Sequence, residues 1–272
     1  MKIFISADIE GTAGIVNWKE TEPGDQYSYF AAQMTGEVSN ACQGALDGGA
    51  DEILVRDAHD SARNLNPAGL PRKARILRGW TGGLYTMMDG LDETFDAAAM
   101  TGYHTCAASN GNPLAHTMTT SVEKITINGM PCSEFMINAY IAAYEEVPVI
   151  FVSGDSMLCD LAKDLCPNIT TVATSVGVGG GSIGMHPEEA KDAIRAGMTS
   201  AVARLKEQKA AGQPSDCMIT LPDRFVLEVT YRDHKKAYTA SFYPGVVQTG
   251  PKTVVYEASD YGDVLGFILF CV

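Results

Sequence analysis

Two carboxylates stand at the end of the first apolar segment of the chain. Residues 1–5 (MKIFI) predict a short buried strand, and Ser6, Asp8 and Glu10 follow at alternate positions. Side chains two residues apart point to the same side of a strand, so these three should face the same way. Gly11 then permits a sharp turn or the close approach of a ligand to the backbone. Buried carboxylates need a positive partner, so the pattern predicts either a metal ion or, alternatively, two ordinary solvated acids.

Three more side chains able to bind a metal occupy comparable places. His59 and His104 come just after predicted strands, and Glu134 lies in the first turn of a predicted helix. Two imidazoles with three carboxylates suit zinc or manganese better than calcium, which prefers oxygen ligands alone. Asp8 could bridge two ions with its two oxygens, as in hydrolases that hold paired ions roughly 3.5–4 Å apart.

One further histidine, His116, lies in the loop that follows His104. Its expected task is proton transfer or stabilisation of an oxyanion. For any single histidine, a hydrogen-bonded structural role is the alternative. Three of the five histidines fall at or beside predicted strand ends, and this grouping favours a functional site.

Strands and helices alternate along the part of the chain that must position these residues. Strands are predicted at 1–5, 52–57, 74–78, 97–101, 124–127, 147–153 and 170–176, and helices at 27–48, 83–90, 133–144, 156–165 and 186–212. Such alternation implies parallel strands joined by right-handed crossovers, and ligands of such sheets gather at the carboxyl ends of strands. We therefore predict an α/β fold, with a mostly parallel sheet and helices on both faces.

The C-terminal part of the chain predicts a smaller α+β subdomain. Its expected strands and final helix lie at 224–229, 237–242, 253–257 and 260–271. We place the domains at residues 1–212, which form the α/β metal-binding catalytic domain, and 213–272. The glycine-rich run 177–184 lacks the spacing of the known phosphate-binding loops and is interpreted as a flexible loop near a surface or interface.

Composition excludes several classes of protein. The formal net charge of −13 argues against nucleic acid as a partner, because its phosphates would be repelled. No apolar run reaches the length of a membrane span, and Met1 leads straight into a strand without a secretory signal. The seven cysteines are scattered, which suits reduced thiols. We therefore expect a cytoplasmic protein that binds neither nucleic acid nor membranes.

Residues 6–11 (SADIEG) resemble the S-x-D-x-E-G signature of the zinc-dependent D-aminopeptidase family. The similarity covers most of residues 1–175 and the remainder more weakly. It continues through 55–59 (VRDAH), 91–95 (LDETF), 102–104 (GYH), 115–118 (AHTM), 128–129 (NG), Glu134, 138–140 (NAY), 147–149 (VPV) and 153–155 (SGD).

This resemblance implies a binuclear zinc site, with two Zn²⁺ per subunit and Mn²⁺ or Co²⁺ as possible substitutes. The implied ligands are Asp8, as the bridging group, with Glu10, His59, His104 and Glu134. His116 matches the catalytic histidine of the family. Members of the family remove N-terminal D-amino acids, such as D-alanine, from short peptides. They form homodecamers of two stacked pentameric rings whose active sites face an internal chamber.

The segment 176–185, which is glycine-rich here, departs from the family pattern, since relatives commonly carry basic or bulkier residues there. Substrate preference or assembly could differ accordingly. Two other functions stay open. One is a metal-dependent hydrolase of another class, an amidase or a phosphoesterase, although Arg56 is the only basic residue at the motifs. The other is a non-catalytic metal-binding ring scaffold.

Overall fold

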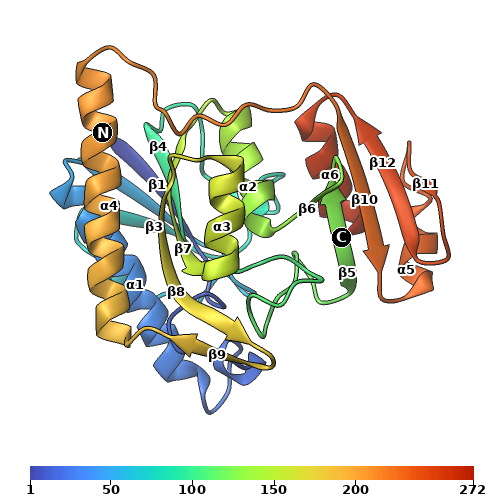
Figure 1. The fold of residues 1–272 in the computed structure, drawn as a ribbon, viewed down its shortest axis with the longest axis horizontal. Helices are drawn as coiled ribbons and strands as arrows, with labels where there is room; N and C mark the ends of the chain where they lie inside the picture. The colour runs from blue at the N-terminus through green and yellow to red at the C-terminus, as the bar shows by residue number, and fades with distance from the viewer.

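The computed structural model describes residues 1–272 and contains two sheets, shown in Figure 1. The larger has the strand order β3-β2-β1-β4-β7-β8-β9. Its strands are β1 (Lys2–Ala7), β2 (Glu52–Asp57), β3 (Ala74–Leu77), β4 (Ala97–Tyr103), β7 (Val149–Asp155), β8 (Thr170–Val178) and β9 (Gly181–Gly184). All neighbours in this sheet are parallel except β8 and β9. The predicted mostly parallel α/β sheet is confirmed.

Helices cover both faces of the larger sheet (Figure 1). On one face α1 (Tyr27–Asp47) packs against α4 (Pro187–Ala210), and on the other lie α2 (Glu134–Tyr144) and α3 (Ser156–Leu165). Short 3-10 turns occur as η1 (Trp18–Glu20), η2 (Pro67–Gly69) and η3 (Thr86–Met88). The helix predicted at 83–90 is wrong, because only η3 forms there. Positive φ angles at Thr86 and Gly90 prevent a continuous helix.

The smaller sheet is antiparallel, with the order β11-β12-β10-β5-β6. Its strands are β5 (Val122–Ile127), β6 (Met130–Pro131), β10 (Phe225–Tyr231), β11 (Val247–Gln248) and β12 (Thr253–Ala258), accompanied by α5 (His234–Ala240) and α6 (Tyr261–Cys271). Two of these strands come from residues 122–131, between the elements of the larger sheet. Asn128 and Gly129 join them with positive φ angles of 52° and 81°, as a tight hairpin turn requires. The domain boundary at residue 213 stays a prediction.

The strand predicted at 237–242 is wrong, since α5 occupies most of it. Tyr238, Thr239 and Phe242 are common in strands, which explains the prediction. A helix forms instead because the side chain of Asp233 accepts a hydrogen bond from the backbone of Lys235 at 2.8 Å and caps the first turn.

The glycine-rich run 177–184 is the β8–β9 hairpin rather than a flexible loop. The turn lies at Gly179, which has a φ of +58°. A Cβ placed on Gly177 would lie 2.5 and 2.6 Å from the carbonyl oxygens of Asn110 and Gly111. A glycine there lets the hairpin approach the loop after β4 closely.

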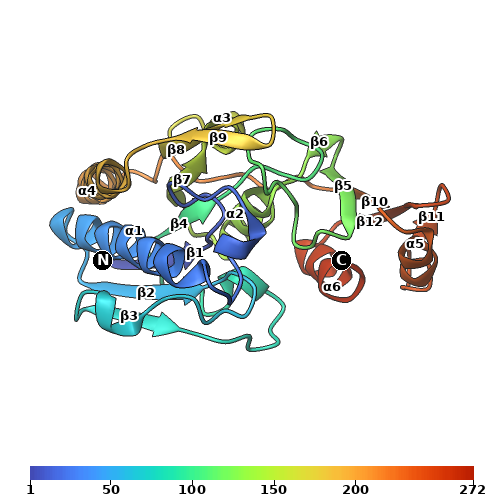
Figure 2. The same cartoon turned by 90° about the horizontal axis from the view of Figure 1, so that it is seen from below.

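The two sheets lie side by side in Figure 2, where the strands of the larger sheet follow one another from β3 to β8. One hydrophobic core runs through both. Tyr140 of α2 packs edge-on against both Tyr261 of α6 and Phe225 of β10. The hydroxyl of Tyr261 donates to the carbonyl of Ile137 at 2.9 Å. The smaller unit thereby holds α2, whose first residue is Glu134, in a fixed position.

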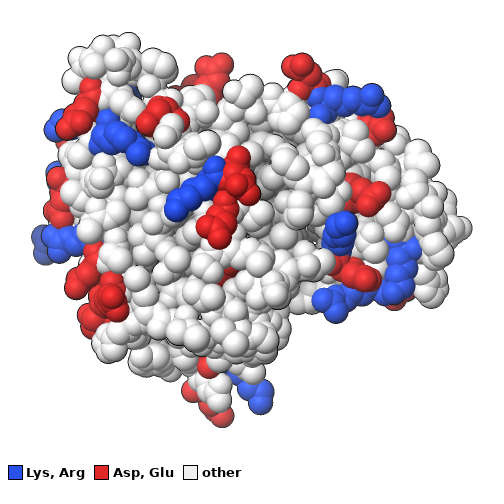
Figure 3. Space-filling model, in the orientation of Figure 1, with Lys and Arg blue, Asp and Glu red and all other residues white.

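Acidic and basic side chains are interspersed over the face in Figure 3, with wide uncharged areas between them. None of the helices combines the length and the apolar character that a membrane crossing requires.

Candidate active site

The predicted site residues converge beyond the carboxyl end of β1. This strand pairs with β2 on one side and β4 on the other, at the place where the strand order reverses. The segment after β1 supplies Asp8 and Glu10, the end of β2 supplies His59, the end of β4 supplies His104, the following loop supplies His116, and α2 supplies Glu134.

The backbone of residues 8–11 is held against the neighbouring strand ends. The amide of Asp8 donates to the carbonyl of Thr101 at 2.9 Å, and the amide of Gly11 donates to the carbonyl of Gly102 at 2.8 Å. Because β1 ends at Ala7, strand alternation does not direct the two carboxylates; these backbone contacts do. A Cβ on Gly11 would collide with the carbonyl oxygen of Tyr103. Gly11 thus permits the approach of a neighbouring strand rather than of a ligand.

Asp8, Glu10 and His59 form a first group of metal-capable side chains. Nδ1 of His59 lies 3.2 Å from Oδ1 of Asp8 and 3.2 Å from Oε2 of Glu10. The three donor atoms all lie within 4.8 Å of one another, and all three residues are buried.

Asp8, His104 and Glu134 form a second group. Nε2 of His104 lies 3.6 Å from Oδ2 of Asp8 and 3.5 Å from Oε2 of Glu134. These donor atoms also lie within 4.8 Å of one another and belong to buried residues. Asp8 therefore belongs to both groups, with one carboxylate oxygen facing each histidine.

Each histidine contacts a backbone carbonyl through its other ring nitrogen. Nε2 of His59 lies 3.0 Å from the carbonyl of Thr21, and Nδ1 of His104 lies 2.9 Å from that of Thr105. A carbonyl only accepts, so these nitrogens carry the proton. The nitrogens that face the carboxylates are then free to donate a lone pair, which is the arrangement that orients histidine ligands of metals.

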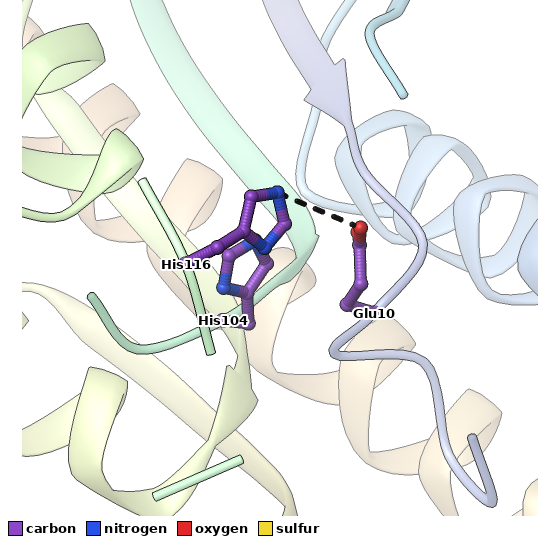
Figure 4. Close-up of side chains that lie close together, drawn as sticks. All are labelled: Glu10, His104 and His116. Carbon is purple, nitrogen blue, oxygen red and sulfur yellow. Dashed lines mark ion pairs between the residues drawn. The ribbon is translucent and has the colours of Figure 1, made fainter. Parts of the chain in front are cut away.

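His116 stacks on His104, with ring centroids 4.4 Å apart, and faces Glu10 (Figure 4). Its Nε2 lies 3.5 Å from Oε1 of Glu134 and 3.9 Å from Oε1 of Glu10. Its Nδ1 contacts the carbonyl of Leu114 at 2.9 Å. Since His116 also forms a metal-capable group with Glu10 and His104, distances alone allow it to bind a metal or to transfer a proton.

Burial is the largest influence on the pKa of each central group and opposes its charged form. Burial, together with the charge of Glu10, raises the pKa of Asp8 well above its ordinary value. For Glu10 the facing imidazoles, His59 above all, outweigh burial and hold the pKa well below its usual range. His104 likewise lowers the pKa of Glu134 to about 2. The carboxylates raise the pKa of His59 and His104 well above the ordinary value despite burial. The cluster therefore demands positive charge, which protons or metal cations can supply.

Several donor atoms at the centre of the cluster lack hydrogen-bond partners. They are Oδ2 of Asp8, both carboxylate oxygens of Glu10, and Nε2 of His104. Buried polar atoms are otherwise almost always paired, so unpaired lone pairs that point at one another fit metal ions between them. The residues present therefore fit the zinc ions expected from the sequence.

A cavity of about 300 Å³ opens above the cluster. Both tryptophans of the chain, Trp18 and Trp80, line it, together with Met118 and Thr119. Sequence reasoning did not identify these residues as a cavity wall: Met118 stands out only as part of the motif 115–118, and isolated tryptophans and threonines carry no motif. The rarity of tryptophan was the only available signal.

A buried set of carboxylates and imidazoles below such a cavity is the arrangement expected of a metal-dependent hydrolase. Comparisons with known proteins narrow this class. The family model for D-aminopeptidases, peptidase family M55, matches residues 1–270. The chain belongs to the D-aminopeptidase family and is a peptide hydrolase.

A D-aminopeptidase of Bacillus subtilis (strain 168) is 32% identical over 266 residues, which are 96% of this chain and 92% of that relative. A solved structure, the Zn-dependent D-aminopeptidase DppA from Bacillus subtilis, a self-compartmentalizing protease, superposes with a TM-score of 0.87. It is 30% identical in sequence, and the match covers 99% of this chain and 96% of that one.

Proposed function

We propose that this protein is a binuclear zinc aminopeptidase that removes the N-terminal D-amino acid, of the D-alanine type, from short peptides. The shared carboxylate of Asp8 is the observation that supports the two-ion site best. One ion would be held by Asp8, Glu10 and His59, and the other by Asp8, His104 and Glu134. The family membership supports the reaction, and the zinc dependence of the similar solved structure supports the metal.

When bound, zinc supplies a Lewis acid that polarises a carbonyl and lowers the pKa of water. The chain supplies the rest of the chemistry. Asp8, Glu10 and Glu134 hold negative charge in a buried site, where its effect is strong. His116 holds or delivers a proton at Nε2, because Nδ1 is committed to the carbonyl of Leu114.

We further propose a cytoplasmic homodecamer of two stacked pentameric rings, with the active sites facing an internal chamber. The description of the similar solved structure as a self-compartmentalizing protease supports an assembly of this kind. A chamber would admit short or extended peptides and exclude folded proteins.

Metal analysis coupled to a stereochemical screen tests the reaction. We expect two zinc ions per chain and faster release of the first residue from D-Ala-Gly-Gly than from L-Ala-Gly-Gly. Turnover should vanish after chelation and return with zinc. Equal rates for the two peptides would refute the D-specificity. Hydrolysis of p-nitrophenyl phosphate without hydrolysis of any peptide would place the protein in another hydrolase class.

Asp8→Ala tests the shared ligand. We expect the variant to lose both ions, because Asp8 places one carboxylate oxygen 3.2 Å from His59 and the other 3.6 Å from His104. Glu22→Gln is the matched control, since Glu22 lines the cavity but belongs to none of the metal-capable groups. It should retain zinc. Near-stoichiometric zinc in Asp8→Ala would contradict the bridge.

A further inference from the structure

Trp80 lies on the cavity wall with one face of its ring covered and the other open. The guanidinium carbon of Arg56 lies 4.6 Å from the ring centroid and covers the first face. The indole Nε1–H donates to the carbonyl of Asp60 at 2.6 Å and pins the edge of the ring. Trp80 nevertheless remains 46% exposed.

The support beneath Trp80 is rigid. Arg56 is fully buried, and its Nη1 donates to the carbonyl of Gly79 at 2.6 Å. Its Nε donates to the carbonyl of Thr86 at 3.3 Å. Gly79 and Gly82 flank the tryptophan with φ angles of +79° and +78°, which a larger residue would adopt only under strain. A buried arginine and two glycine turns thus hold the Trp80 ring in place with one aromatic face directed to the cavity.

The cavity lining carries acidic side chains without Lys or Arg to balance them. Glu22 and Asp60 line it in addition to the three carboxylates of the cluster, and no Lys or Arg does. The three carboxylates would offset most of the charge of two bound ions. Glu22 and Asp60 would then repel an acidic side chain of the substrate. Such a side chain would also lack a cationic partner in the cavity.

We propose that Trp80 is the specificity-determining residue of this cavity. The open face of its indole ring receives an apolar side chain of the peptide substrate, on a residue next to the scissile bond. Peptides with an acidic side chain at these positions are poor substrates. Arg56 is a positioning residue that acts through Trp80. This inference rests on the proposed aminopeptidase function and names its class of substrate as short apolar peptides.

The kinetic test compares D-Phe-Gly-Gly, D-Ala-Phe-Gly, D-Ala-Gly-Gly and D-Glu-Gly-Gly as substrates of the zinc-loaded enzyme. Trp80→Ala should lower kcat/KM for at least one phenylalanine peptide about tenfold or more, since removal of apolar contact costs roughly that factor. The loss should appear in KM, with kcat and zinc content nearly unchanged, and should be within about threefold for D-Ala-Gly-Gly. Trp80→Phe should restore most of it. Tyr29→Ala removes an exposed aromatic residue outside the cavity and should alter no preference.

An equal effect of Trp80→Ala on all four peptides, or no effect, would overturn the proposal. So would fast turnover of D-Glu-Gly-Gly by the unaltered enzyme.

A binding experiment separates this inference from the proposed reaction. In Trp18→Phe, Trp80 is the sole tryptophan of the chain. Its fluorescence should shift on addition of D-phenylalanine and not on addition of D-glutamate. A shift without turnover of any peptide would refute the proposed function and support the role of Trp80. Turnover without a shift would refute the role of Trp80 alone.

Discussion

His104 and His116 lie face to face in the site but differ in their access to the cavity. The side chain of His104 is fully buried, whereas 13% of the His116 side chain is exposed, and His116 lines the cavity. A group that exchanges protons with a substrate must meet it directly. This difference supports the proposal that His104 binds metal and His116 transfers a proton.

His116→Ala should therefore retain two zinc ions and lose about 10²- to 10⁴-fold in kcat, the usual contribution of a general acid or base. Metal analysis and steady-state kinetics on D-Ala-Gly-Gly measure both quantities. His234→Ala, which removes a largely exposed histidine far from the cluster, is the control. Unchanged turnover would remove His116 from the mechanism, and loss of one ion would make it a ligand instead.

Glu37 is a buried carboxyl outside the cluster, on α1. Its Oε1 accepts a hydrogen bond from the amide of Ala13 at 2.9 Å, while its Oε2 has no partner. Burial raises its pKa from 4.5 to about 7. The folded protein thus binds this proton more tightly than the unfolded chain, so the contribution to stability is present below pH 4.5 and is lost as the pH rises to about 7.

Glu37→Gln should accordingly be stabilised relative to the unaltered protein above pH 7, by up to about 3 kcal/mol, and differ little near pH 4.5. Urea unfolding of the two proteins at pH 5, 6, 7 and 8 measures the difference. Glu52→Gln, at an exposed position in β2, provides a baseline. A difference that stays constant over this range would show that Glu37 does not titrate within it.

Among the elements, the crossing of the segment after β1 with the end of β4 is the tightest feature near the site. Gly11→Ala would drive a Cβ into the carbonyl oxygen of Tyr103. Backbone would have to shift, and Asp8 and Glu10 lie on the shifting segment. We expect a loss of several kcal/mol in stability and weaker zinc binding. Thermal unfolding and zinc titration measure these effects.

Gly180→Ala is the control for this substitution. Its Cβ would meet nothing within 4 Å, and no positive φ is found at Gly180. Its stability and zinc affinity should match the unaltered protein. Normal zinc binding by Gly11→Ala would mean that the ligands do not depend on this crossing.

The parallel sheet and the gathering of the site residues were predictable because each depends on short-range patterns. Apolar runs followed by Asp8, His59 or His104 mark strand ends, and parallel strands bring such ends to one edge. The long-range pairing of β5 with β10 was not predictable, since it joins residues about a hundred positions apart through geometry that no local pattern encodes.

The sequence predictions that proved wrong also have local causes. In α5 the cap at Asp233 outweighs strand-forming residues. In the β8–β9 hairpin, the glycine at 177 permits close packing against the loop after β4, whereas flexibility was expected of the run. The walls of the cavity depend on which loops meet above the sheet, so Trp18 and Trp80 became visible only in the folded molecule.

At the scale of the whole molecule, two separate elements carry exposed apolar side chains. The β8–β9 hairpin exposes Val178 and Ile183, and the α5–α6 region exposes Phe242 and Phe270, each by more than half. Closed rings are built from heterologous interfaces, in which one patch on a subunit meets a different patch on the next. A molecule with two distinct apolar patches meets this requirement, whereas a two-fold dimer needs only one.

The proposed decamer should sediment with a mass of about 290 kDa, ten times the 29.0 kDa of the chain. If the two patches meet across the ring, Ile183→Glu and Phe270→Glu should each bury a charge in that interface and prevent ring closure. Both variants should then yield the same smaller species, with the fold retained by circular dichroism. Lys73→Glu, which alters an exposed charged residue outside both patches, should keep the full mass. Full-size particles from both patch variants would place the ring contacts on other surfaces, and a mass of 29.0 kDa for the unaltered protein would exclude a self-enclosed chamber.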